Sequence, residues 1–252
     1  MIPKERKRVA PMLTNMEGKR VPHVTFRTRV DGQWKDVTSE ELFAKKRVVA
    51  FALPGAFTPT CSSSHVPRYN ELAPALKACG IDDIVCISVN DAFVMTEWAK
   101  DQAATNIHFV PDGNGEFTAA MGMLVDKRPL GFGSRSWRYS MLVDDGLVKK
   151  MFVEPEVDGD PFQVSDAETM LRYLDPQAKP PHDILLFTKP GCAHCARARR
   201  LLAERGWAYE DIPSTPRRLR AVSAKATTPQ VFVDGEYVGG ADELEAYLTR
   251  SP

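Results

Sequence analysis

A proline-rich segment near residue 180 constrains the fold of this chain more than any other feature of its sequence. The run DPQAKPP, at residues 175–181, holds three prolines in seven residues. Proline fixes φ and has no backbone N–H, so such a run neither continues a helix nor pairs inside a sheet, and it favours an extended, semi-rigid connector. We therefore expect two domains, 1–174 and 183–252, joined by a linker at 175–182. A length of 252 residues is compatible with that division.

The segment before the linker has the pattern of an α/β domain. Its expected strands are apolar runs or flank a hairpin signal, and they lie at 48–53, 84–89, 140–143 and 147–153. A helix is expected over 62–79, where apolar residues are spaced to form one face. A further helix closes the domain over 165–174, and Ser165 and Glu168 have the spacing of a capping box at its start.

The segment after the linker predicts a smaller α/β domain with the order β-α-β-α-β-β-α. Its first strand, 184–188, leads through a Pro-Gly turn into a helix from residue 192 to residue 205. The remaining elements are a strand at 207–211, a helix at 217–224, a hairpin of strands 230–233 and 236–238 around Asp234-Gly235, and a helix at 242–249.

Composition narrows the class of function. Lys plus Arg number 33 and Asp plus Glu number 33, so the chain lacks the basic excess typical of a nucleic-acid binder. The longest apolar run, 48–53, is far shorter than the roughly 18 residues of a membrane span. The N-terminal stretch MIPKERKRVAPM is basic but has no apolar stretch after it, so it does not resemble a secretory signal. We expect a cytoplasmic protein with no nucleic-acid and no membrane partner.

Cysteine chemistry is the most informative part of this sequence. The five cysteines are Cys61, Cys79, Cys86, Cys192 and Cys195. An odd number of cysteines, in a chain without a signal peptide, makes a poor disulfide framework. Because the sequence contains a single CxxC pair, we expect no metal site. In a reducing compartment the remaining roles for a cysteine are an inert buried thiol or a reactive one.

Cys61 follows the turn PGAFTPT, between an expected strand and an expected helix. In the first turn of a helix, unpaired N–H groups and the helix dipole stabilise a thiolate, and only the thiolate attacks a peroxide. Position alone leaves two alternatives open, a reactive thiol and a buried cysteine in an ordinary strand–helix turn.

The residues around Cys61 resemble a known family. Pro54, Thr58 and Cys61 form the pattern Pro-x-x-x-Thr-x-x-Cys, which resembles the peroxidatic motif of the peroxiredoxins. The longer string PGAFTPTCSSSHVPRY is similar to the peroxiredoxin-5 branch, and the stretches SVNDAFVMTEW, FVPDGNGEFTAAMGM and RYSM support that reading. The resemblance covers about residues 1–174 and implies a thioredoxin-like fold.

This resemblance implies roles for four residues. Cys61 is expected to be the peroxidatic nucleophile, and Thr58 to hydrogen-bond both its thiolate and the incoming peroxide. Pro54 is expected to shield the thiolate from water. Arg138 is expected to supply a cation that stabilises the thiolate and the charge that develops on the leaving oxygen. From its residue type alone, Arg138 is equally compatible with a solvated surface position.

Attack on a peroxide leaves a sulfenic acid, which another thiol must reduce. Some peroxiredoxins carry a second cysteine between the Glu-Pro position, here Glu154-Pro155, and the last helix of the domain. Residues 162–165 of this chain are Phe-Gln-Val-Ser and contain no cysteine. Cys86 lies in an expected buried strand and Cys79 at a helix end, so both are expected to be inert. The first domain is therefore expected to need an outside reductant.

The second domain carries the motif CAHC, residues 192–195, at its strand-to-helix turn, where the helix N-terminus favours a reactive first thiol. With TTP at 227–229 and GG at 239–240, this motif resembles the glutaredoxins over about residues 183–252. Many glutaredoxins have Pro-Tyr where this chain has Ala-His. A protonated His194 would make the disulfide more oxidising and a merely exposed one would not, so the redox potential stays open.

The glutaredoxin resemblance implies catalytic roles for Cys192 and Cys195, with Cys195 one turn deeper and more buried. It also implies a glutathione site. Lys189 is expected to contact the glycine carboxylate, and Asp242 the γ-glutamyl amino group. The full set expected to bind glutathione, with a cis peptide bond at the proline, is Lys189, Thr228, Pro229, Gly240 and Asp242.

Together the two segments resemble the bacterial hybrid peroxiredoxin–glutaredoxin proteins, with two thioredoxin-like α/β domains joined by a short proline-rich linker. This implies a glutathione-dependent peroxidase acting on hydrogen peroxide and organic hydroperoxides, with glutathione as reducing co-substrate and no bound cofactor or metal. Fusion raises the local concentration of the reductase if the linker can span the two sites of one chain; a short linker that cannot do so favours delivery to a neighbouring subunit. We expect a homo-oligomer, dimer or tetramer, and which subunit the second domain serves stays open. The alternatives are a peroxide-sensing redox relay and a glutathione-dependent protein-disulfide reductase.

Overall fold

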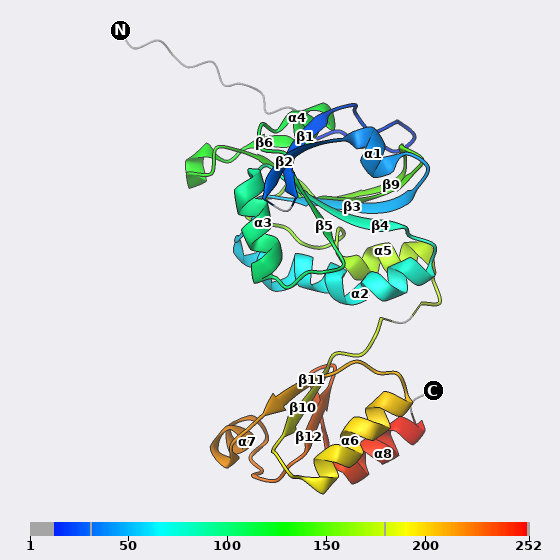
Figure 1. The fold of residues 1–252 in the computed structure, drawn as a ribbon, viewed down its shortest axis with the longest axis vertical. Coiled ribbons are helices and arrows are strands. Elements are labelled where there is room, and N and C mark those ends of the chain that lie inside the picture. Colours follow the sequence, from blue (N-terminus) through cyan, green and yellow to red (C-terminus); the bar gives the residue numbers. More distant parts are fainter. Residues whose placement is uncertain (1–12, 31, 179, 251–252) are drawn as a thin grey trace. The chain divides into compact units, whose positions relative to one another are not determined.

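The computed structural model describes residues 13–30, 32–178 and 180–250, and Figure 1 shows them as a ribbon. The chain separates into two compact units, unit 1 at Met1–Ala178 and unit 2 at Lys179–Pro252. The basic N-terminal stretch, Lys179 of the expected linker and the last two residues lie outside the described residues. Each unit has its own sheets and its own apolar core, so each is described by itself.

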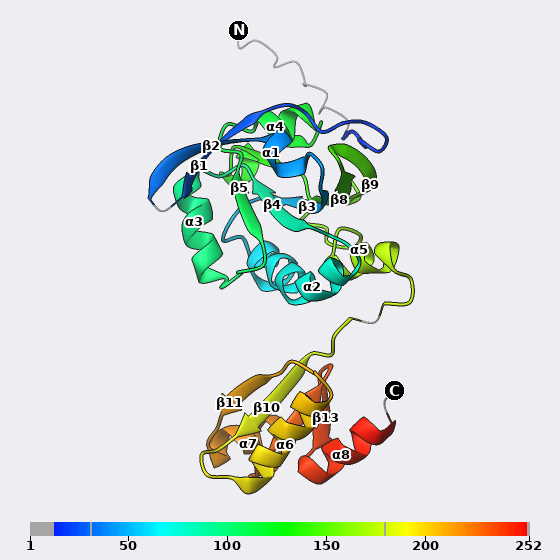
Figure 2. The same cartoon turned by 45° about the vertical axis from the view of Figure 1, so that its right-hand side comes forward.

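Unit 1 is built on a five-stranded mixed sheet in the order β5-β4-β3-β8-β9 (Figures 1 and 2). Its strands are β3 (Arg47–Leu53), β4 (Asp83–Ser88), β5 (His108–Pro111), β8 (Tyr139–Asp144) and β9 (Leu147–Val153). The first three run parallel, whereas β8 pairs antiparallel with both β3 and β9. Two short antiparallel ladders join β1 (Thr25–Val30) to β2 (Gln33–Thr38), and β6 (Leu124–Asp126) to β7 (Ser134–Ser136), the latter pair connected through the 3₁₀ turn η2 (Arg128–Leu130).

The central strand β3 is apolar on both faces because each face of the sheet carries a core. Successive side chains of a strand point to opposite faces, so Phe51 packs into one core while Ala50 and Ala52 pack into the other. Figure 2 shows helices on both sides of this sheet. Around the first core lie α2 (Val66–Ala78), α3 (Ala92–Asp101) and α5 (Ala167–Leu174), and around the second lie α1 (Ser39–Phe43) and α4 (Glu116–Ala120).

Unit 2 has a four-stranded sheet in the order β11-β10-β12-β13. Its elements are β10 (Ile184–Thr188), α6 (Ala193–Glu204), β11 (Glu210–Pro213), α7 (Pro216–Ser223), β12 (Gln230–Val233), β13 (Glu236–Gly239) and α8 (Ala241–Arg250). Leu186 of β10, Leu202 of α6 and Leu244 of α8 are fully buried in one small core. Within the described ranges of the whole chain, no helix combines the length and the apolar character needed to span a membrane.

The predicted α/β fold class is confirmed, and the element order of unit 2 is the predicted one. The expected strand at 207–211 is displaced: β11 is Glu210–Pro213, and its pairing with β10 starts at Leu185 opposite Glu210. Trp207 is not part of this strand; its ring packs against His182 with centroids 4.3 Å apart. The observed strand therefore begins three residues after Trp207, where the expected strand began.

The start of α5 also differs from the expectation. Its N-cap is Asp166, whose carboxylate accepts the Thr169 N–H at 2.8 Å. The predicted capping box from Ser165 to Glu168 is wrong, because the Ser165 hydroxyl donates to Glu154 at 2.7 Å instead. A buried carboxylate eleven residues earlier in the chain thus takes the hydroxyl that the local cap would have used.

Phe51→Ala should lower the free energy of unfolding of unit 1 by about 3–5 kcal/mol. Phe51 is fully buried, and its ring stacks on Tyr69 with centroids 4.2 Å apart. Urea unfolding followed by tryptophan fluorescence measures the change. The control is Leu130→Ala, which truncates a side chain that is 63% exposed and should cost less than about 0.5 kcal/mol. Equal losses in the two variants would contradict the assignment of Phe51 to the core.

Candidate active sites

The first candidate site lies where the central strand of unit 1 passes into a helix. β3 leads into a loop at 54–58, the next two residues are helical, and Cys61 begins the π-helix η1 (Cys61–His65), which continues into α2. The Ala56 N–H donates to Asn90 Oδ1 at 3.0 Å and fastens the loop to the end of β4. The Val66 N–H closes the wide turn on the Cys61 carbonyl, and π turns of this kind are frequent at functional positions.

Arg138 lies against the sulfur of Cys61. Its Nη1 donates to Cys61 Sγ at 3.4 Å and to His65 Nδ1 at 3.1 Å, and its Nη2 forms an ion pair with Asp160. The Arg138 side chain is 1% exposed, and its guanidinium lies over the Phe162 ring, 5.4 Å from the centroid. Arg138 is therefore not a solvated surface arginine. It is a buried cation in contact with a buried thiol.

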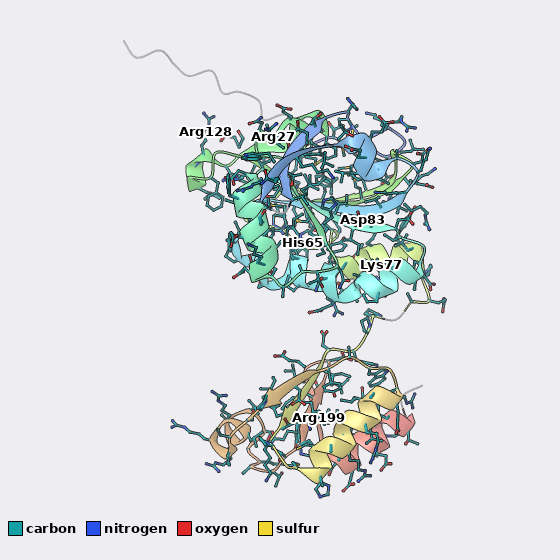
Figure 3. All side chains as sticks on the ribbon, viewed as in Figure 1. Arg27, His65, Lys77, Asp83, Arg128 and Arg199 are labelled. Atoms are coloured by element: carbon teal, nitrogen blue, oxygen red, sulfur yellow. The ribbon has the colours of Figure 1, made fainter. Side chains whose placement is uncertain are left out.

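His65 belongs to this site, although the sequence analysis assigned it no role. Its Nε2 donates to the Ser165 carbonyl at 3.1 Å, which leaves Nδ1 as the acceptor for Arg138. Burial, and then the positive charge of Arg138, lower the pKa of His65 well below its usual value, against the opposing effect of the Ser165 bond. His65 is thus neutral. Figure 3 labels this residue among the side chains of unit 1. Its spacing from Cys61, four residues along a helical stretch, is the signal that could have indicated it.

The loop before α5 is held by a single buried carboxylate. Glu154, at 1% exposure, accepts the backbone N–H groups of Gln163, Val164 and Ser165 at 2.8 to 2.9 Å. It also accepts the Ser165 hydroxyl at 2.7 Å. These bonds hold the Ser165 carbonyl in place for His65. Sequence reasoning used Glu154 only as a landmark and missed this function, because the donors are backbone groups.

Thr58 and Pro54 lie in the loop that precedes Cys61, and both are partly buried. The Thr58 hydroxyl donates to the Gly55 carbonyl at 2.9 Å. The expected hydrogen bond from Thr58 to the Cys61 sulfur is therefore not the one that the structure shows. Because the hydroxyl proton is committed to Gly55, the Thr58 oxygen keeps its acceptor capacity for another donor.

Of the two remaining cysteines of unit 1, Cys86 is buried and Cys79 is partly buried. Cys86 is fully buried in β4, and burial, followed by the nearby Cys61, raises the pKa of Cys86 well above its usual value. Its thiol is therefore protonated at neutral pH. Cys79 is the C-cap residue of α2, and its carbonyl accepts a hydrogen bond from Arg47 at 3.0 Å.

The second candidate site is the CxxC turn of unit 2. Cys192 is the N-cap of α6, and its sulfur accepts the Cys195 N–H at 3.1 Å and the Thr228 hydroxyl at 3.6 Å. Burial by itself raises the pKa of Cys192. The hydrogen bonds from Cys195 and Thr228, with the positive charge of Lys189, lower it by more, so this thiol is more acidic than a free cysteine. Burial, and then the Cys192 thiol, raise the pKa of Cys195.

The residues expected to bind glutathione fall into two groups. Lys189, Thr228 and Pro229 adjoin Cys192, and the Thr228–Pro229 peptide bond is cis, as expected. Gly240 and Asp242 lie at the start of α8. There the Gly240 N–H donates to Glu243 at 2.8 Å, and Asp242 forms an ion pair with Arg197 of α6. His194 is exposed on the first turn of α6.

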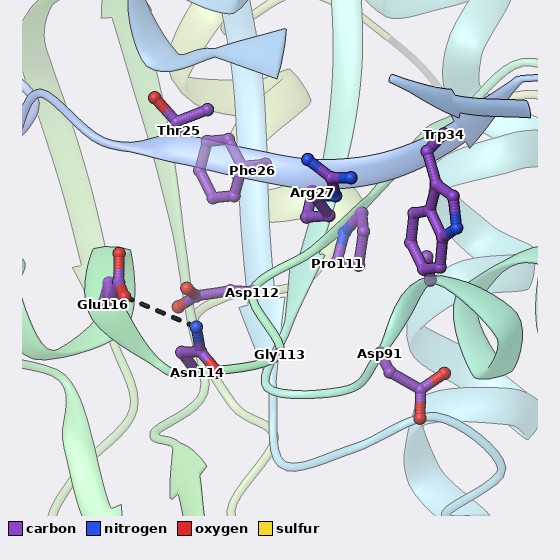
Figure 4. Close-up of a pocket in the computed structure, with 11 residues that line it drawn as sticks. Thr25, Phe26, Arg27, Trp34, Asp91, Pro111, Asp112, Gly113, Asn114 and Glu116 are labelled. Carbon is purple, nitrogen blue, oxygen red and sulfur yellow. Dashed lines mark hydrogen bonds between the residues drawn. The ribbon is translucent and has the colours of Figure 1, made fainter. Parts of the chain in front are cut away.

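A separate pocket of about 290 Å³ lies beneath β1, and Figure 4 shows its lining. The walls come from β1, from Trp34 of β2, from the start of α3 and from the loop after β5, where Asn114 donates to Glu116 at 3.4 Å. No cysteine lines this pocket, so it is not part of either thiol site. Among the described residues, no group of three or more His, Cys, Asp and Glu side chains is arranged to hold a metal ion.

Two family models match the chain, and their limits follow the two units. The model described as Redoxin matches residues 16–171, and the model described as Glutaredoxin matches residues 184–238. The hybrid peroxiredoxin hyPrx5 of Haemophilus influenzae is 59% identical over 240 residues, a match that covers 94% of this chain and 100% of that protein. The chain belongs to the hybrid peroxiredoxins.

Further relatives match the peroxiredoxin domain by itself. A peroxiredoxin of Synechocystis, sll1621, is 56% identical over 172 residues, which is 63% of this chain and 91% of that protein. The crystal structure of reduced Prx3 from Vibrio vulnificus in complex with hydrogen peroxide has 43% identity and a TM-score of 0.61, and the match covers 64% of this chain and all of that one. The expected thioredoxin-like architecture of the two domains is confirmed, and the protein is a peroxidase of the peroxiredoxin type.

Arg138→Ala should slow the reaction of the peroxiredoxin domain with hydrogen peroxide by about 10²-fold, because it removes a buried donor aimed at the sulfur where charge develops. Rapid-mixing kinetics measure the rate constant. Arg128→Ala is the matched control, since that arginine has a 74% exposed side chain and pairs with Asp126. A rate equal to that of the control would remove Arg138 from the mechanism.

Cys192 should be alkylated by iodoacetamide well before Cys195 at neutral pH, because the pKa of Cys192 is lowered and that of Cys195 is raised. The labelling rate should rise with pH and level off once the Cys192 thiol is deprotonated. Lys189→Gln should move this curve to higher pH, because it removes a positive charge near the thiolate, whereas Lys225→Gln should not. Peptide mapping by mass spectrometry follows the reaction. Earlier labelling of Cys195 would reverse the assignment.

Proposed function

We propose that this hybrid peroxiredoxin reduces hydrogen peroxide and organic hydroperoxides at Cys61 with electrons from glutathione, and that its glutaredoxin domain recycles Cys61. The observation that carries the proposal is the 3.4 Å contact between the Arg138 guanidinium and the Cys61 sulfur. A cation in that position stabilises the thiolate before attack and the charge on the leaving oxygen during it.

In the first step the Cys61 thiolate attacks one peroxide oxygen and the O–O bond breaks. The sulfur becomes a sulfenic acid, and the other oxygen leaves as water or an alcohol after it takes up a proton. The Thr58 oxygen, whose own proton goes to Gly55, accepts the hydrogen bond of the bound peroxide. Pro54 keeps bulk water from the thiolate. The relative from Vibrio vulnificus, solved with hydrogen peroxide, supports a site for this substrate.

In the second step glutathione attacks the sulfenic acid. Water leaves, and a mixed disulfide joins Cys61 to glutathione. Glutathione is the proposed thiol because residues 154–165 contain no cysteine and because Cys86 is buried and protonated. The loop that holds a second cysteine in some relatives is instead fastened here by the hydrogen bonds to Glu154.

In the third step the Cys192 thiolate attacks the glutathione sulfur of the mixed disulfide, which releases the Cys61 thiolate and leaves glutathionylated Cys192. A second glutathione attacks that disulfide and departs as oxidised glutathione. The lowered pKa of Cys192 supports its role as the attacking thiol. The residues proposed to bind glutathione are Lys189, Thr228, Pro229, Gly240 and Asp242. For Asp242 to bind the γ-glutamyl amino group, it must share its carboxylate with Arg197.

Two further expectations belong to this proposal. Because the proposed reaction consumes reduced glutathione, we expect the protein to be located in the cytoplasm. The short proline-rich linker favours service to a neighbouring subunit, and therefore a homo-oligomer.

A coupled assay tests the proposal. It contains peroxide, glutathione, glutathione reductase and NADPH, and no protein client. Steady NADPH oxidation with hydrogen peroxide and with an organic hydroperoxide is the expected result. Cys61→Ser should abolish it while leaving the reduction of a small glutathione mixed disulfide intact. A redox relay or a protein-disulfide reductase would show no sustained turnover without a client.

Cys192→Ser and Cys195→Ser should behave differently in this assay. Only Cys192 is needed to remove glutathione from Cys61, so Cys192→Ser should stop after one reduction of peroxide, with glutathionylated Cys61 detectable by mass spectrometry. Cys195→Ser should keep a substantial fraction of the turnover. If both variants were equally inactive, the route would need a disulfide between the two cysteines and the scheme above would be wrong.

A further inference from the structure

Arg138 divides its guanidinium between two partners on opposite sides, the Cys61 sulfur and the Asp160 carboxylate. On one side Nη1 reaches the Cys61 sulfur at 3.4 Å, together with the ring of His65. On the other side Nη2 forms an ion pair with Asp160, from the loop that precedes α5. The third guanidinium nitrogen, Nε, is buried and has no hydrogen-bond partner among the described residues. Asp160 was not singled out from the sequence, because it lies in an acidic loop, EPEVDGD, that reads as solvated surface.

The other titratable groups around this guanidinium carry no charge or face elsewhere. His65 is neutral because its pKa is lowered, and the raised pKa values keep the Cys86 thiol and the Tyr69 hydroxyl protonated. The Glu154 carboxylate is occupied by the backbone N–H groups of residues 163–165. Once the Cys61 thiol ionises, the site therefore holds one cation and two anions, the thiolate and the Asp160 carboxylate.

We propose that Asp160 is a positioning residue of the peroxidase site, which acts through Arg138 and limits how strongly the guanidinium stabilises the Cys61 thiolate. This inference rests on the proposed roles of Cys61 and Arg138. Two anions that share one cation repel each other, so each is less stable than it would be alone. The Asp160 charge therefore raises the pH at which the thiol ionises, and keeps the thiolate more basic and more nucleophilic than an unshared arginine would.

The loop is built to hold Asp160 in this place. Two residues after it, the Phe162 ring lies under the guanidinium and against His65, with centroids of the two rings 4.9 Å apart. Beyond Phe162, the next three residues are fastened by Glu154. The Asp160 side chain is nevertheless 40% exposed, while that of Arg138 is 1% exposed. Asp160 is thus the solvent-exposed partner of a buried cation.

The test compares Asp160→Asn with Asp158→Asn. Both variants remove one negative charge from the same loop, but Asp158 is an exposed residue outside the site. The rate constant for hydrogen peroxide is measured by rapid mixing across a range of pH. The thiolate is titrated in parallel by its ultraviolet absorbance, as the difference between each protein and the same protein carrying Cys61→Ser. Thermal unfolding followed by circular dichroism verifies that each variant is folded.

Asp160→Asn should move the ionisation of the Cys61 thiol about 0.5 to 1 pH unit lower. Below the ionisation midpoint the larger thiolate fraction outweighs the lower nucleophilicity of each thiolate, and the peroxide rate rises by about 2- to 4-fold; at high pH only the lower nucleophilicity remains, and the rate falls by about 1.5- to 3-fold. Asp158→Asn should move the curve by much less. Asp160→Glu keeps the charge and should stay near the parent protein. The shift for Asp160→Asn should persist at high salt, because a close pair with a buried cation is poorly screened.

Three results would overturn the proposal. Equal shifts in Asp160→Asn and Asp158→Asn would mean a general effect of surface charge. An unchanged titration with a slower reaction at every pH would mean that Asp160 only holds the loop. An unchanged titration and an unchanged rate would mean that it does nothing in the site. Asp160→Ser serves if the asparagine variant does not fold. Full activity of Cys61→Ser would instead refute the proposed function, so the two failures are distinguishable.

Discussion

Arg138 is a long, charged side chain with 1% exposure, and much of unit 1 near Cys61 is arranged around that fact. A buried guanidinium is costly unless other groups offset the lost hydration. Four groups do so here: the Cys61 sulfur, the His65 ring, the Asp160 carboxylate and the face of Phe162. They come from a helix start and from the loop before α5, so the buried charge ties together two segments that are about a hundred residues apart in sequence.

Cys61 and Cys192 lie in the same kind of strand-to-helix turn, but the groups around them differ. Each cysteine follows a buried strand and stands at the start of a helix. Cys61 is fully buried, and its sulfur contacts a buried cation. Cys192 is partly exposed, and hydrogen bonds and a surface lysine lower the pKa of its thiol. The two sulfurs are thus held by different interactions, a buried guanidinium at Cys61 and backbone and hydroxyl donors at Cys192.

Much of the fold and the outline of both sites could be predicted from local patterns. The apolar run at 48–53 and the hairpin around Asp234-Gly235 predict strands because their signals are complete within a few residues. The capping box at Ser165 was wrong because a buried carboxylate, Glu154, takes the hydroxyl. The spacing of His65 from Cys61 could have indicated that the two residues lie together, but not that His65 is neutral. That property, and the place of Asp160 in the site, depend on side chains from distant segments, which sequence spacing does not show.

The sequence by itself determined which thiols stand at helix starts, since a strand, a turn and a helix are local structures whose residues are neighbours in the chain. It also determined the division into two units, through a run of prolines that cannot enter a helix or a sheet interior. Only the tertiary structure decided that Arg138 faces the Cys61 sulfur, that His65 is neutral, and that Asp160 shares the same cation. These properties depend on burial and on charges brought together from distant segments, and the strength of an electrostatic interaction is set by distance and surroundings rather than by order along the chain.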